Sequence, residues 1–165
     1  MIYLFTIGDV IVYGAQGVCK IDSTQIKQIG KDSAEYFVLK PVFSENTSLF
    51  VPVENKTLTA RMQPLLTTDE ARNIINSASK AELIEAKDDN QKREEYKNIL
   101  SSNNRQRLVS LIKTINFEKE TRRQSGKRLN INDEQTLKKA ELLLYNELAL
   151  VLGVEPQQVQ SEMEF

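Results

Sequence analysis

The chain has 165 residues, of which 40% are apolar, and a formal net charge of −1. This length predicts one or two domains with a core of modest size, and the overall charge indicates no class of partner. The absence of histidine excludes Ser-His and Cys-His nucleophile arrangements and removes the commonest metal ligand. The single cysteine, Cys19, cannot form a disulfide within the chain and is expected to be a small core residue.

The sequence carries no targeting or membrane signal. The first apolar run has no basic leader and is broken at Gly8-Asp9, which is not the pattern of a signal peptide. No run approaches the roughly 18 apolar residues that are needed to span a bilayer. We therefore expect a cytoplasmic protein that does not contact a membrane.

Residues 1–64 are predicted to be all-β. Alternating and β-branched residues are punctuated by glycine, asparagine and aspartate turn signals. The pattern predicts five short strands, over residues 5–13, 17–29, 34–41, 48–53 and 59–63. Five short strands are too few for two packed sheets, so we expect a bent sheet that closes into a small five-stranded barrel.

Residues 65–165 are predicted to form an all-α bundle of four to five helices, which gives a two-domain α+β chain. Thr67 and Glu70 have the spacing of a capping box, which predicts a helix start. Apolar residues at helical spacing then predict the remaining helices, over residues 80–86, 91–100, 105–124 and 133–152, with a last short helix from Pro156. Asn132 is the expected N-cap of the longest helix.

The sequence shows no motif for catalysis, phosphate binding or calcium binding. No glycine-rich phosphate loop is present, and no calcium-loop spacing occurs. The paired carboxylates lie at predicted helix starts or on polar helix faces, where the helix dipole or solvent accommodates them. The sequence therefore predicts no catalytic residue, no metal site, no cofactor and no small-molecule substrate, and hence a protein that is not an enzyme.

The distribution of charge is more informative than its sum. Residues 90–140 contain thirteen basic and six acidic residues, a local excess of seven positive charges on a chain whose net charge is −1. Such an asymmetry is typical of a face that meets phosphate. The candidate DNA-binding residues are Lys92, Arg93, Lys97, Arg105, Arg122, Arg123, Lys127 and Arg128. Two alternative interpretations remain open. The cations of residues 122–128 would interact favourably with the dipole at a helix C-terminus, and those of residues 92–97 would lie on a solvated helix face.

Several segments together resemble one protein family. The opening stretch TIGDVIVYGAQGV (residues 6–18), EYFVLK (35–40) and VPVEN (51–55) resemble the CarD family of bacterial transcription regulators (the CarD/CdnL group). YKNIL (96–100) and the segment 138–149 resemble helices in the second half of that family. The likeness covers most of the chain, although its N-terminal part is shared with transcription-repair coupling factors.

The resemblance implies a function. Residues 1–64 would form a Tudor-like barrel that docks on the β subunit of RNA polymerase, and residues 65–165 would contact promoter DNA near the edge of the melted bubble, in the minor groove or on the phosphate backbone. The regulator would then modulate the stability of the open complex. The polymerase contacts implied by the resemblance are Lys27 and the strand around Ser48, Leu49, Phe50, Val51 and Pro52.

The sequence departs from the family pattern at two positions. Family members often insert a tryptophan into the minor groove, and the matching position here is Lys92, which can supply a phosphate contact but not an apolar wedge. An arginine that contacts polymerase in some members is replaced by Phe50, which favours apolar burial and edge-strand pairing. Two alternatives therefore remain open: an adaptor that binds polymerase without significant DNA contact, and a small-barrel RNA-binding protein with exposed stacking aromatics.

Overall fold

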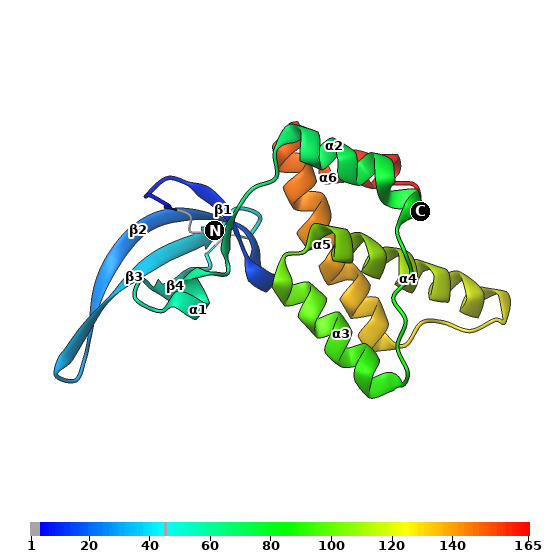
Figure 1. Ribbon diagram of the computed structural model, residues 1–165, viewed down its shortest axis with the longest axis horizontal. Helices are drawn as coiled ribbons and strands as arrows, with labels where there is room; N and C mark the ends of the chain where they lie inside the picture. Colours follow the sequence, from blue (N-terminus) through cyan, green and yellow to red (C-terminus); the bar gives the residue numbers. More distant parts are fainter. Residues whose placement is uncertain (1–3, 45) are drawn as a thin grey trace. The chain divides into compact units, whose positions relative to one another are not determined.

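The computed structural model describes residues 4–44 and 46–165 and divides into two compact units, Met1–Leu65 and Leu66–Phe165 (Figure 1). We call them the sheet unit and the helical unit. The sheet unit contains the described strands, and the helical unit contains the long helices. This order of a five-stranded antiparallel sheet followed by about five helices confirms the predicted fold class.

The sheet is antiparallel, with the strand order β4-β3-β2-β1-β5. Its strands are β1 (Val10–Tyr13), β2 (Gly17–Ile29), β3 (Asp32–Pro41), β4 (Leu49–Pro52) and β5 (Met62–Pro64). The long hairpin of β2 and β3 extends beyond β4, which pairs only with residues 36–39 of β3 (Figure 1). β4 and β5 are therefore the two edge strands.

The first and last strands begin later than predicted, because a side chain caps the backbone before each of them. The first predicted strand is shorter than expected, because Asp9 Oδ2 accepts the Thr6 N–H (2.9 Å) and closes a turn before β1. A short 3₁₀ turn, Gly14–Gln16, joins β1 to β2. The last predicted strand begins late, because Asn55 Oδ1 accepts the Leu58 N–H and starts an unpredicted helix, α1 (Lys56–Thr59).

Cys19 lies in the apolar core of the sheet unit, as its sequence context predicted. It is fully buried and packs with Ile21 of its own strand and with one apolar residue from each of the other four strands, Ile11, Leu39, Val51 and Met62. Burial raises the pKa of its thiol from 9.0 to about 11. The thiol is therefore a structural group, since the thiolate and not the thiol is the reactive form.

This pKa shift predicts that the sheet unit loses stability in alkaline solution. The unfolded thiol ionises near pH 9 and the folded thiol only near 11, so the unfolded state releases its proton first and stability falls as the pH rises through this window. The free energy of unfolding should drop by about 1 kcal/mol between pH 9 and 10. Denaturant titrations followed by the methyl signals of Ile11 and Leu39 would measure it. Cys19→Ala should remove this part of the pH dependence, and an unchanged dependence in that variant would contradict the assignment.

The helical unit contains α2 (Thr68–Ser77), α3 (Asp89–Ser102), α4 (Arg105–Gln124), α5 (Ile131–Leu152) and α6 (Pro156–Glu162). The predicted capping box is present, with Glu70 N–H donating to Thr67 Oγ1 and Thr67 N–H donating to Glu70 Oε1. The N-cap of α5 is Asn130 and not the predicted Asn132, because Asn130 Oδ1 accepts the Asp133 N–H at 2.8 Å. The helix therefore starts two residues early.

The predicted helix over residues 80–86 is wrong. Only a 3₁₀ turn, Ala78–Lys80, precedes an extended segment. The ammonium of Lys113 on α4 donates to the carbonyl oxygens of Ser79 (2.8 Å) and Ala81 (2.7 Å). The Ile84 N–H donates to Thr114 Oγ1 (2.9 Å). These bonds to α4 replace the bonds that the segment would make within a helix, so tertiary contacts override a favourable helix propensity.

Candidate functional site

The strand that the sequence singled out for docking is an edge of the sheet. Leu49 and Val51 of β4 point into the core, whereas Phe50 between them is 41% exposed and Ser48 is exposed. This alternation is that of a strand with one buried face. β4 therefore presents one aromatic side chain outward while its neighbours anchor it.

The backbone of β4 is also open on one side. Val53 N–H donates to Glu35 O (2.9 Å), so the backbone N–H of Val53 points toward β3. Because the bonding direction alternates along an antiparallel strand, the N–H and C=O of Phe50 face the open edge. Pro52 lacks an N–H at the next outward position, which is where an edge strand tolerates proline.

Lys27 and Phe50, named separately by the resemblance, are brought together by the fold. Lys27 is on β2 and its ammonium lies 3.4 Å from the centroid of the Phe50 ring and 5.8 Å from that of Tyr36. Cross-strand pairing puts Lys27, Tyr36 and Phe50 on the face of the sheet opposite to the core. We call these three residues the outer-face cluster. A cation over an exposed aromatic ring is worth about 0.5–1 kcal/mol, which is enough to orient the ring.

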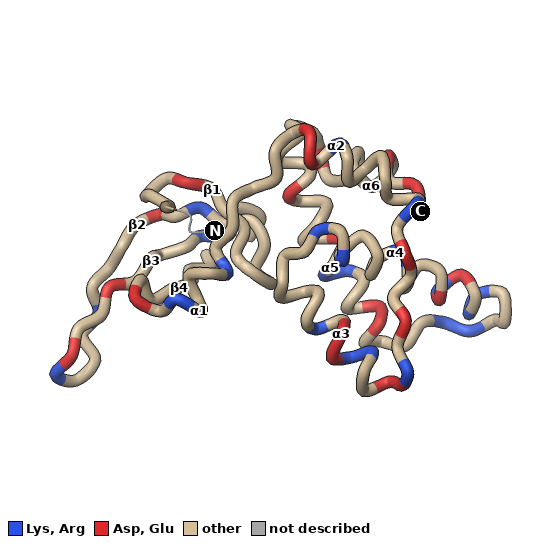
Figure 2. The backbone as a smooth tube through the Cα atoms, viewed as in Figure 1, with Lys and Arg blue, Asp and Glu red and all other residues tan. Residues whose placement is uncertain are grey.

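The candidate DNA-binding residues fall into two groups. Arg93, Lys97, Arg123, Lys127 and Arg128 are exposed. Lys92, Arg105 and Arg122 are partly buried and make contacts within the helical unit. Figure 2 shows basic and acidic residues interspersed along α3 and α4, with basic residues at the connection from α4 to α5. The excess of positive charge is thus only partly available to a partner.

Arg105 is held by a buried ion pair. Its Nε and Nη2 each donate to one oxygen of Glu147, both at 2.8 Å, and the Glu147 side chain is only 3% exposed. Glu147 Oε2 also accepts the N–H of Leu66 at 3.0 Å, so the same carboxylate holds the first residue of the helical unit. Sequence reasoning missed Glu147. The sequence feature that could have identified it is a carboxylate next to Leu148, beside the apolar stripe of α5.

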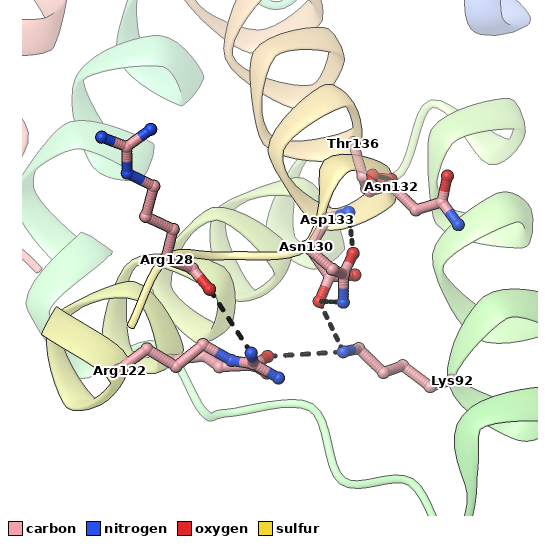
Figure 3. A network of polar contacts seen from close by, with 8 residues as sticks. Lys92, Arg122, Arg128, Asn130, Asn132, Asp133 and Thr136 are labelled. Carbon is pink, nitrogen blue, oxygen red and sulfur yellow. Dashed lines mark hydrogen bonds and ion pairs between the residues drawn. The ribbon is translucent and has the colours of Figure 1, made fainter. Parts of the chain in front are cut away.

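Lys92 lies at the centre of a polar network that joins three helices (Figure 3). Its ammonium donates to Asp133 Oδ2 (2.7 Å) and lies 3.4 Å from Glu118 Oε2. Burial acts to lower the pKa of Lys92. The hydrogen bond to Asp133 and the charges of Asp133 and Glu118 act against it, and the net pKa lies above the usual lysine value. The charge of Lys92 is therefore neutralised inside the protein.

The network continues into the connection between α4 and α5. Arg122 Nε donates to Glu118 Oε1 (3.2 Å), and its Nη1 donates to the carbonyl oxygen of Arg128 (3.4 Å). Arg123 makes an exposed pair with Glu120. Within residues 4–44 and 46–165, Lys127 and Arg128 form no ion pair. They are thus exposed cations on an ordered connection.

The described part of the chain has neither a metal-binding cluster nor a membrane-spanning helix. No group of three or more cysteine, aspartate or glutamate side chains is arranged to hold a metal ion there. None of the helices described is both long and apolar enough to cross a bilayer.

A comparison with known protein families identifies the sheet unit. Residues 5–66 match the CarD-like/TRCF RID domain, a Tudor-like fold, and this match covers the sheet unit. No curated protein matches the chain. This domain family is not an enzyme family, and it indicates a transcription-related protein that interacts with RNA polymerase. Residues 5–66 are therefore identified as a CarD-like/TRCF RID domain.

Proposed function

We propose that the chain is a bacterial transcription regulator that docks on the β subunit of RNA polymerase and contacts promoter DNA with its helical unit. It would act in the cytoplasm, at the nucleoid, by modulating the stability of the open complex. The observation that carries the proposal is the CarD-like/TRCF RID match over residues 5–66, in a unit whose edge strand is open and carries an exposed aromatic ring.

The proposed docking mode is strand addition to β4. An extended segment of the β subunit would pair with the outward N–H and C=O of Phe50, and main-chain hydrogen bonds would supply affinity. The outer-face cluster would supply specificity, because a partner side chain can pack on the Phe50 ring while a carboxylate meets Lys27. Leu49 and Val51 would then anchor the strand in the core, whereas Ser48 and Pro52 would act through their backbone.

The proposed DNA contact is to phosphate. The candidates are the exposed cations, Arg93 and Lys97 on α3 and Arg123, Lys127 and Arg128 at the end of α4 and the connection after it. Lys92 and Arg105 are neutralised by Asp133 and Glu147, which reduces the number of available charges. That reduction is the observation that favours the adaptor alternative.

Run-off transcription on a promoter that melts slowly tests the proposal. Open complexes would be formed with and without the full chain, challenged with a competitor, and followed for their lifetime. A change in lifetime of several-fold in either direction supports regulation at the open complex. An unchanged lifetime, with the β subunit still retained in a pull-down, would favour the adaptor.

The salt dependence of DNA binding is expected to report the phosphate contacts. Replacing Lys127 with alanine should reduce the slope of log affinity against log salt by about 1, because one fewer counterion is released. Fluorescence anisotropy of labelled duplex promoter DNA across a salt series would measure the slope. Lys31→Ala, which removes the same charge from the sheet unit, should leave it unchanged. A flat salt response of the unmodified chain would contradict DNA contact altogether.

A further inference from the structure

The connection between α4 and α5 is held at both of its ends, and both holds meet at Lys92. On the α4 side, Glu118 accepts from Arg122, whose guanidinium reaches forward to the carbonyl oxygen of Arg128. On the α5 side, Asp133 Oδ2 accepts from the side-chain amide of Asn130 (3.0 Å). The ammonium of Lys92, from α3, lies between the two carboxylates (Figure 3).

The backbone of this connection depends on the same residues. The carbonyl oxygen of Arg122 accepts the N–H groups of Ser125 (3.0 Å) and Lys127 (2.8 Å). The Gly126 N–H donates to Arg123 O (3.0 Å), and Gly126 has a φ of 71°, in the left-handed region that suits glycine. The main chain at residues 125–130 thus has a defined path, although its side chains are mostly exposed.

Removing the ammonium of Lys92 would replace its attraction to Glu118 and Asp133 with repulsion between these two carboxylates. Glu118 and Asp133 both approach the Lys92 Nζ, at 3.4 and 2.7 Å, so without it two carboxylates would face each other in a partly buried site. Two carboxylates that face each other repel, and the repulsion is stronger where solvent screens less. The two carboxylates hold opposite ends of the connection, so their separation would loosen it.

We propose that Lys92 is a positioning residue, which orders the basic connection 125–130 through Glu118, Arg122 and Asp133 and does not itself contact DNA. The proposal rests on the proposed DNA contact of this connection. An ordered connection presents Lys127 and Arg128 without an ordering cost at the moment of binding. This role differs from that of a phosphate contact, which the sequence had suggested for Lys92.

Amide hydrogen exchange of the free protein tests the ordering. Lys92→Met keeps the aliphatic stem and should speed exchange at Gly126 and Lys127 by about tenfold relative to the core amides of α5. Lys113→Met is the matched control, because Lys113 is equally a partly buried lysine of the helical unit that ties two groups together, but it has no bond to this connection. Unchanged exchange at Gly126 and Lys127 in Lys92→Met would overturn the proposal.

DNA binding of the same variants separates positioning from contact. If Lys92 only positions the connection, Lys92→Met should weaken the affinity for DNA several-fold. It should leave the salt slope unchanged, since the number of phosphate contacts is the same. A slope reduced by about 1 would identify Lys92 as a phosphate contact and overturn the proposal. Lys92→Arg, which can still bridge the carboxylates, should restore both exchange protection and affinity.

The remaining outcomes are also decisive. If Lys92→Met does not fold, Glu118→Gln provides a second variant, because it removes the charge that Lys92 and Arg122 share. It should again speed exchange at Gly126 and Lys127, and failure to do so would overturn the proposal. If the unmodified chain does not bind DNA, the proposed DNA contact fails, while the exchange comparison still decides whether Lys92 orders the connection.

Discussion

Replacing Glu147 with alanine is expected to lower the free energy of unfolding of the helical unit by about 3–5 kcal/mol, the usual cost of breaking a buried ion pair from one side. Glu147 accepts two hydrogen bonds from Arg105 and one from the Leu66 N–H. Its removal would leave a guanidinium that is 13% exposed without this counter-charge. It would also remove the side-chain partner of a partly buried backbone N–H, which adds a desolvation cost.

Urea titrations of the full chain, followed by far-ultraviolet circular dichroism, would measure this loss. Glu82→Ala provides the control, because Glu82 is exposed on the extended segment and its removal changes the net charge equally. That control should shift stability by no more than about 0.5 kcal/mol. A loss below about 1 kcal/mol in Glu147→Ala would contradict the expected energetic role of the pair.

A double substitution separates the pair from its isolated charges. Arg105→Met combined with Glu147→Leu removes both charges and puts apolar side chains in a site that is already mostly buried. The double variant should be more stable than Glu147→Ala alone, because both charges of the buried pair are then removed together. If the double variant loses as much stability as the two single changes together, the two residues act independently.

Much of the fold was predictable because its signals are local. The capping box of Thr67 and Glu70 needs only the spacing of two residues, and it is present as predicted. The strand Gly17–Ile29 has the predicted bounds, because glycine turn signals mark both of its ends. The predicted helix over residues 80–86 failed for the opposite reason, since the bonds that hold this segment come from Lys113 and Thr114 on α4.

The candidate site was less predictable, because a charge count treats every cation as available. Lys92 and Asp133 are 41 residues apart in the sequence, and Arg105 and Glu147 are 42 apart. No local pattern joins such pairs, and their contact depends on how α3, α4 and α5 pack. The predictions for the exposed residues Arg93, Lys97 and Lys127 remain open to the binding measurements proposed above.

Replacing Phe50 with alanine is expected to weaken binding to RNA polymerase by at least about 30-fold, or about 2 kcal/mol, which is the loss typical of an aromatic anchor at an interface. The ring is exposed and held by Lys27, so it is ordered before any partner arrives. An aromatic side chain that is already oriented loses little conformational entropy on binding. Its truncation should therefore remove mainly contact energy and change the stability of the sheet unit little.

Surface-plasmon titrations of purified RNA polymerase over the immobilised full chain would measure the loss. Phe43→Ala is the matched control, because Phe43 is also an exposed phenylalanine of the sheet unit but lies outside β4. Lys27→Met should cost less than Phe50→Ala and should reduce the salt dependence of association, because it removes a steering charge but keeps the stem over the ring. Equal affinities of Phe50→Ala and Phe43→Ala would argue against docking through β4, and they would direct the search to another surface of the CarD-like domain.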